Sequence, residues 1–145
     1  MAKKINCRTK NNFKCLDYGT IKTSPSQTPP ERLRVLNNEL DKLIKKHQPK
    51  ILVVESLFFF RNFKTAMPVS QAKGVILLTA AKKRVPVHEF TPLQVKMIVT
   101  GSGRAEKKQV QLKIKSLFGF KNVPKPDDAA DALAIALAYV FTKRA

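Results

Sequence analysis

Four apolar residues in succession, Ile51-Leu52-Val53-Val54, constrain the fold of this chain more than any other segment. A strand with one solvent-facing side alternates apolar and polar residues, whereas a strand covered on both faces reads as an unbroken apolar run. Helical patterns lie on both sides of this run in the sequence, over residues 28–49 and 65–83. This alternation predicts an α/β fold in which helices flank a sheet.

Turn signals divide the rest of the chain into further short segments. Strands are predicted over 13–21 and 85–90, and helices over 92–100, 105–118 and 128–141. Thr28 and Glu31 form a capping box that predicts the start of the first helix. Asp127 is expected to cap the last one.

The charge balance predicts an anionic partner. The chain has 28 Lys and Arg residues against ten Asp and Glu, a formal net charge of +18. Such a surface attracts polyanions, because lysine and arginine displace the counterions condensed on phosphates. Nucleic acid is therefore the first partner to consider.

A membrane partner and a disulfide framework are both disfavoured. The longest apolar run, 132–141, is too short to span a bilayer. Residues 1–12 lack the apolar centre of a signal peptide. Cys7 and Cys15 do not form a Cys-x-x-Cys pair, so we expect reduced thiols and a cytoplasmic location.

Three carboxylates are candidates for a metal site. Glu55 directly follows the apolar strand, at the kind of edge where ligands collect in open α/β sheets. Asp128 and Asp131 are three residues apart at the start of a helix, so they share one face. Brought together, they would offer the hard oxygen ligands that Mg²⁺ accepts, and a basic protein with such a site suggests two-metal phosphodiester hydrolysis.

Structural explanations for these acids remain open. Asp127 and Asp128 are favoured at a helix start by the helix dipole, whatever the function. Glu55 could pair with a lysine or arginine. Asp131 is harder to explain in this way, because its neighbours in the helix are apolar.

Several sequence blocks occur in an order that is typical of one enzyme family. They are Glu55-Ser56-Leu57-Phe58-Phe59, Gln71-Ala72-Lys73-Gly74, Thr91-Pro92-Leu93-Gln94-Val95-Lys96, Gly101-Ser102-Gly103-Arg104-Ala105-Glu106-Lys107-Lys108-Gln109-Val110 and Pro126-Asp127-Asp128-Ala129-Ala130-Asp131-Ala132-Leu133-Ala134. From about residue 13 to the C-terminus the chain resembles the RuvC family of Holliday-junction resolvases.

The resemblance implies a fold, a reaction and partners. It implies an RNase H-like mixed sheet flanked by helices, in homodimers whose protomers each nick one of two symmetric strands of a four-way DNA junction. The helix over 65–83 resembles the family's dimer-forming element. The resemblance also implies Mg²⁺, with Mn²⁺ as a substitute, and association with the family's branch-migration helicase complex.

The same resemblance assigns site residues. It makes Glu55, Asp128 and Asp131 the metal ligands. Lys96 and Lys107 would be catalytic lysines that also bind phosphate. Phe58 would contact an unstacked base, and Arg104 would bind DNA. On the residues alone, core is the favoured explanation for residues 58–60, and a solvated helix face is the favoured explanation for Lys107 with Lys108.

The family pattern opens with two strands that this sequence lacks, the first reading like Gly-Ile-Asp-Pro-Gly with a metal-binding Asp. We therefore expect a truncated family member, with a basic segment over 1–12 replacing those strands and the RuvC-like domain over 13–145. Residues 4–9 could supply at most one edge-like strand. Weakened metal binding, impaired catalysis and marginal stability are expected to follow.

Three functional hypotheses result. The first is a metal-dependent endonuclease that resolves Holliday junctions in DNA recombination and repair. The second is a catalytically impaired protein that still binds junction DNA. The third, a basic RNA-associated or ribosome-associated domain, gives no reason for Glu55, Asp128 and Asp131.

Overall fold

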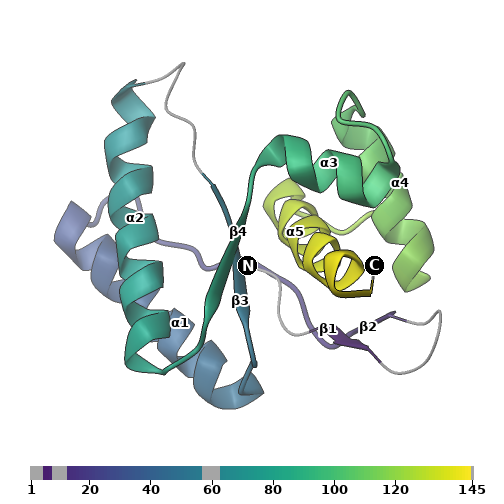
Figure 1. Cartoon of the computed structure of the whole chain (residues 1–145). Helices are drawn as coiled ribbons and strands as arrows, with labels where there is room; N and C mark the ends of the chain where they lie inside the picture. The colour runs from purple at the N-terminus through teal and green to yellow at the C-terminus, as the bar shows by residue number, and fades with distance from the viewer. Residues whose placement is uncertain (1–4, 8–12, 57–62, 145) are drawn as a thin grey trace. The chain divides into compact units, whose positions relative to one another are not determined.

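The structure, a computed structural model, describes residues 5–7, 13–56 and 63–144. The chain divides into two compact units, which we call unit 1 and unit 2. Unit 1 comprises residues 1–20, 53–56 and 88–145, and unit 2 comprises residues 21–52 and 57–87. All the elements named below are labelled in Figure 1.

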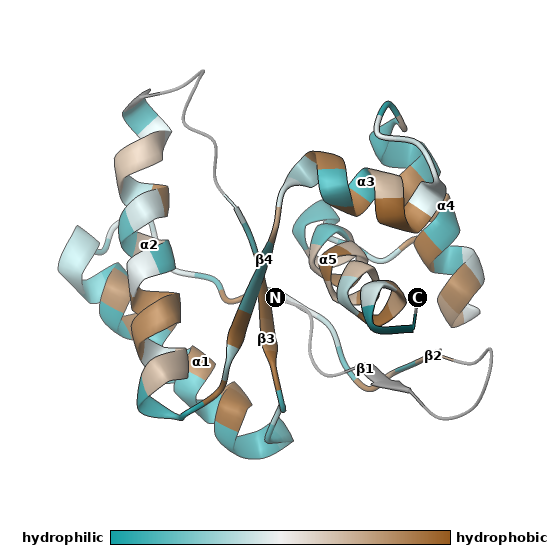
Figure 2. Cartoon of the chain, in the orientation of Figure 1, coloured by the Kyte–Doolittle hydropathy of each residue, from teal (hydrophilic) through white to brown (hydrophobic). Residues whose placement is uncertain are grey.

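Unit 2 is built around two helices, α1 (Pro29–His47) and α2 (Phe63–Lys82), which pack against each other. The predicted capping interaction starts α1, since the Glu31 carboxylate accepts hydrogen bonds from the Thr28 N–H at 2.7 Å and the Thr28 hydroxyl at 2.9 Å. Leu40 and Ile44 of α1 are buried. Figure 2 shows the resulting alternation of hydrophobic and hydrophilic residues along α1.

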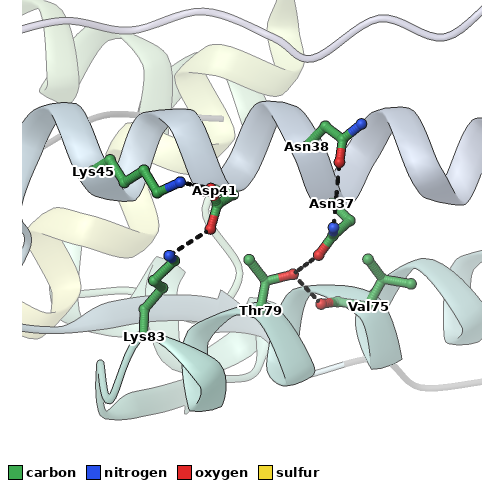
Figure 3. Close-up of polar contacts among 7 residues, drawn as sticks. All are labelled: Asn37, Asn38, Asp41, Lys45, Val75, Thr79 and Lys83. Carbon is green, nitrogen blue, oxygen red and sulfur yellow. Dashed lines mark hydrogen bonds and ion pairs between the residues drawn. The ribbon is translucent and has the colours of Figure 1, made fainter.

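Polar contacts fix the pairing of α1 with α2, as Figure 3 shows. The buried Thr79 hydroxyl lies 2.8 Å from Asn37 Oδ1 and 2.7 Å from the Val75 carbonyl oxygen. One turn further along α1, Asp41 contacts Lys83, which directly follows α2, at 2.9 Å and Lys45 of its own helix at 2.8 Å. The pKa of Asp41 is lowered, first by the hydrogen bond from Lys45 and then by that from Lys83.

The predicted apolar strand is β3 (Leu52–Glu55), and it pairs with β4 (Val87–Phe90). The Ser56 N–H donates to the Phe90 carbonyl at 2.8 Å, and the Leu52 N–H donates to the Pro86 carbonyl at 2.9 Å. Both bonds join residues at the same sequence separation, so the strands run parallel. Residues 51–54 are half-buried.

The N-terminal part of unit 1 is an antiparallel hairpin of β1 (Ile5–Cys7) and β2 (Phe13–Cys15). The expectation of one short strand within residues 4–9 is confirmed. The longer strand predicted over 13–21 ends at Cys15, because apolar composition alone does not supply pairing partners for the residues that follow.

The core of unit 1 is formed by α3 (Pro92–Thr100), α4 (Lys107–Phe118) and α5 (Asp127–Arg144), which pack against one another. Figure 1 shows α5 lying against the other two helices. Its buried residues Leu133 and Leu137 belong to the same cluster as Val99 and Ile114. This packing holds the beginning of α5, which carries the predicted aspartates.

Local signals predicted the ends of these helices well. At the start of α3, the Thr91 hydroxyl accepts from the Gln94 N–H at 3.1 Å, while the Gln94 side chain accepts from the Thr91 N–H at 2.9 Å. Gly101 ends α3 with a φ of 82°, a left-handed conformation that glycine adopts without strain. Asp127 is an exception, because it is the first residue inside α5 and not its cap.

Among the described residues, no helix combines the length and the hydropathy that a membrane span requires.

Candidate active site

Glu55 is the last residue of β3 and carries a perturbed carboxyl group. Its side chain is partly open to solvent, yet protein atoms surround enough of it to raise its pKa by desolvation. The negative charge of Asp131 raises the pKa of Glu55 further. The structure therefore places two carboxylates, one from a strand end and one from α5, close enough to repel each other.

Asp131 shares one side of α5 with both Asp127 and Asp128, because residues three and four apart on a helix are neighbours. Asp127 and Asp128 lie in the first turn, where the positive end of the helix dipole favours acids. Asp131 lies one turn later, and its neighbours Ala130 and Leu133 are completely buried. Residue 131 is thus where α5 passes from its exposed start into the core.

Lys107 contacts two of these acids. Its Nζ lies 3.4 Å from Asp131 Oδ2 and 3.4 Å from Asp127 Oδ2, so the amine is shared between two carboxylates. The pKa of Lys107 is raised, chiefly by the charge of Asp131 and further by Asp127. Lys107 is therefore not merely a solvated helix residue, since it joins the start of α4 to the start of α5.

Asp127 takes a larger part in the cluster than the sequence indicated. Besides Lys107, it accepts a hydrogen bond from the Gln111 side chain at 3.3 Å and lies 3.8 Å from Lys125. These cations and the amide lower the pKa of Asp127, with the hydrogen bond from Lys107 as the largest cause. In the sequence, the one sign of this part was the position of Asp127 beside Asp128. The helix dipole already explained that position.

Among the described residues, no group of three or more acidic, histidine or cysteine side chains is arranged to hold a metal ion. Glu55 and Asp131 are brought together, but Asp128 does not complete such a group with them. Lys107 already balances part of the charge of Asp131, so the acids do not need a metal to coexist. The ligand roles of Glu55, Asp128 and Asp131 stay predictions.

The pair of Glu55 and Asp131 nevertheless fits a hydrated divalent cation. Both groups offer hard oxygen donors, and the charge of Asp131 contributes to the raised pKa of Glu55. Mg²⁺ keeps several waters and is commonly held by one or two carboxylates together with substrate phosphates. Two protein ligands are thus sufficient for an ion that DNA helps to bind.

The other predicted site residues fall at different places. Lys96 is half-buried on α3, and Arg104 is exposed in the loop between α3 and α4. The catalytic and DNA-binding roles of these two residues stay predictions. Phe58 lies outside the described residues.

Comparison with known proteins decides the family. The model of the family described as crossover junction endodeoxyribonuclease RuvC matches residues 4–139. The chain belongs to the RuvC family. A RuvC from Alkaliphilus metalliredigens is 52% identical over 132 residues, which are 91% of this chain and 80% of that protein. A RuvC from Fusobacterium nucleatum is 45% identical over 131 residues, covering 90% of this chain and 69% of its relative.

Solved RuvC structures have the same fold. Thermus thermophilus RuvC in complex with a Holliday junction substrate superposes with a TM-score of 0.90 at 33% identity, over 97% of this chain and 85% of that one. The chain therefore has the RNase H-like fold of the RuvC family, and β3 and β4 form a small parallel sheet in the part of the chain that the structure describes. The prediction of fold class and family is confirmed.

Proposed function

We propose that this chain is a structure-selective endonuclease that resolves four-way DNA junctions by metal-dependent phosphodiester hydrolysis. The observation that carries the proposal is the repulsion between the carboxylates of Glu55 and Asp131, together with the contact of Asp131 with Lys107 at 3.4 Å. Membership of a family named for crossover junction cleavage supports it, as does the likeness to a RuvC solved with a Holliday junction. The reaction would take place in the cytoplasm, during DNA recombination and repair.

The carboxylates and the lysine have complementary tasks. Glu55 and Asp131 would hold Mg²⁺ or Mn²⁺, with Asp128 as a further ligand from the same helix. When bound, the metal would activate water and stabilise the leaving oxygen. Lys107 would offset the negative charge that develops on the phosphate. Lys96 and Arg104 would bind the DNA backbone, and Phe58 would contact an unstacked base.

The excess of positive charge supports the choice of substrate. The formal charge of +18 provides a strong sequence-independent attraction for phosphates. By contrast, a domain that only binds RNA has no use for carboxylates crowded as Glu55 and Asp131 are. The acids weaken phosphate binding unless a cation is recruited between them and the DNA.

Cleavage of a synthetic four-way junction is the direct test. With Mg²⁺ or Mn²⁺ we expect paired nicks in two opposite strands, and no nicks after chelation with EDTA. A linear duplex made from the same strands serves as the substrate control, and it should stay intact. Binding to the junction should weaken steeply as salt is raised.

A junction that is bound but left uncut with either metal would contradict the endonuclease proposal. That result would favour the impaired junction-binding protein. Equal affinity for junction, duplex and a hairpin RNA would contradict both DNA hypotheses.

We also propose that the protein acts as a homodimer through α2. Met67 and Leu78 are 67% and 57% exposed, although both are large and apolar. They lie on the same face of the helix as Gly74, because their spacing is close to a whole number of turns. Space beside the Gly74 Cα is open, so a second helix could approach closely there. The association with a branch-migration helicase complex stays a prediction.

Replacing Leu78 by lysine should shift the protein from dimer to monomer. The added charge would be buried against the apolar stripe of a partner helix, which is unfavourable. Sedimentation velocity measures the change, and Val69→Lys is the control because Val69 is exposed on a different face of α2. A wild-type monomer at every concentration, or equal effects of both substitutions, would argue against this interface.

A further inference from the structure

Lys107 occupies an electrostatically unfavourable place in its own helix. It is the first residue of α4, where the helix dipole presents partial positive charge and repels a cation. Its side chain is still held at one point, 3.4 Å from each of two carboxylates contributed by α5. The position of this amine is therefore set by Asp127 and Asp131, and not by α4.

The Asp127 carboxylate is itself oriented. Its Oδ1 accepts from the Gln111 side chain at 3.3 Å and lies 3.8 Å from Lys125 Nζ, which leaves Oδ2 facing Lys107. Gln111 follows Lys107 by one turn of α4, so both lie on the same side of that helix. The start of α4 thus contacts Asp127 through two side chains, an amine and an amide.

We propose that Asp127 is a positioning residue that keeps Lys107 at the start of α5, next to Asp131, when a divalent cation binds Asp131. This inference rests on the proposed function. A cation at Asp131 competes with Lys107 for that carboxylate and also repels the ammonium group. If Asp131 were its only partner, Lys107 would move into solvent. Asp127 lies one helical turn earlier and is not one of the two carboxylates proposed to bind the metal. It can therefore keep its contact with the Lys107 amine.

Two consequences follow for the bound metal and the reaction. Because Lys107 also pairs with Asp127, it pairs less strongly with Asp131, and the affinity of Asp131 for a metal ion is higher. Asp127 also leaves Lys107 next to the phosphate in the metal-bound protein. Both effects of Asp127 act through Lys107, and both should disappear when Lys107 is removed.

Mn²⁺ binding in the absence of DNA tests the first consequence, with free Mn²⁺ measured by electron paramagnetic resonance. Lys107→Gln should bind Mn²⁺ more tightly, by about threefold, a size typical of exposed ion pairs. Asp127→Asn should bind it more weakly by a similar factor, and Asp127→Glu should restore most of the affinity. In the Lys107→Gln protein, Asp127→Asn should change the logarithm of the Mn²⁺ affinity by less than half of the change that it causes in the wild-type protein.

Single-turnover nicking at saturating Mn²⁺ tests the second consequence. Asp127→Asn should lower the nicking rate without changing the junction concentration at half-saturation. The double variant should nick no more slowly than Lys107→Gln alone. Lys108→Gln is the matched control, because it removes the same charge from the neighbouring, exposed position and should leave the Mn²⁺ affinity within about twofold.

The outcomes separate this inference from the proposed function. If the wild-type protein binds no Mn²⁺ and cuts no junction, the proposed function fails and this inference fails with it. If the wild type binds and cuts, but Asp127→Asn has the same effect with and without Lys107, only the positioning role is wrong. Equal effects of Lys108→Gln and Lys107→Gln would also overturn it, because net charge would then explain the result.

Discussion

Replacing Glu55 by glutamine is expected to lower the rate of junction nicking by at least about 100-fold, while the junction affinity measured without metal stays within about twofold. Even partners that only orient metal ligands commonly contribute tenfold to 100-fold, so a direct ligand should contribute more. Glutamine keeps the size of the side chain but removes the charge that attracts the cation. It also removes the repulsion with Asp131, so the fold should not suffer.

Single-turnover assays on a labelled four-way junction measure this effect, and a gel shift in EDTA measures affinity. Glu39→Gln is the matched control, because it makes the same chemical change on the exposed surface of α1. Full nicking activity of Glu55→Gln would show that Glu55 is not part of the active site. Loss of junction binding together with nicking would assign Glu55 to DNA recognition or folding.

The environment of Glu55 also gives the sign of a pH effect. Its pKa is raised by desolvation and by Asp131, so in the metal-free protein the carboxyl takes up a proton at a higher pH than an ordinary glutamate. Metal binding should weaken as the pH falls through this raised pKa, because the proton competes with the cation. The free energy of unfolding changes in the opposite direction. It falls as the pH rises through the raised pKa of Glu55, because the folded protein disfavours the ionised carboxylate.

Interactions between near neighbours in sequence were the predictable part of this fold. Thr28 with Glu31, and Thr91 with Gln94, satisfy backbone groups within one turn, so the residue types alone predict where α1 and α3 begin. The unbroken run before Glu55 likewise predicted β3. The strand expected over 13–21 was too long, because strand pairing depends on partners that the local sequence does not contain.

The candidate site shows the same division. Family motifs selected Glu55 and Asp131, and the structure places them within range of each other's charge. The role of Asp127 was missed because its partner Lys107 lies on another helix and neither sequence pattern points to the other. Lys107 itself was selected by resemblance to the family, not by its place in α4, where a cation is disfavoured.

Truncating Leu137 to alanine should cost about 3 to 5 kcal/mol of the free energy of unfolding, the largest stability effect that we expect from a single change. Leu137 is completely buried on α5, within the cluster that also contains Val99 of α3 and Ile114 of α4. Removing its side chain leaves a cavity that these helices cannot fill without moving. Urea denaturation followed by circular dichroism measures the loss.

Leu112→Ala is the control for this cavity, because Leu112 lies on α4 with 48% of its surface exposed, and its truncation should cost well under 1 kcal/mol. The same packing fixes the start of α5, so Mn²⁺ binding and nicking by Leu137→Ala should be lost at lower urea concentrations than in the wild type. If Leu137→Ala costs no more than Leu112→Ala, α5 is not the centre of the core, and core packing does not explain how Asp131 is held in place.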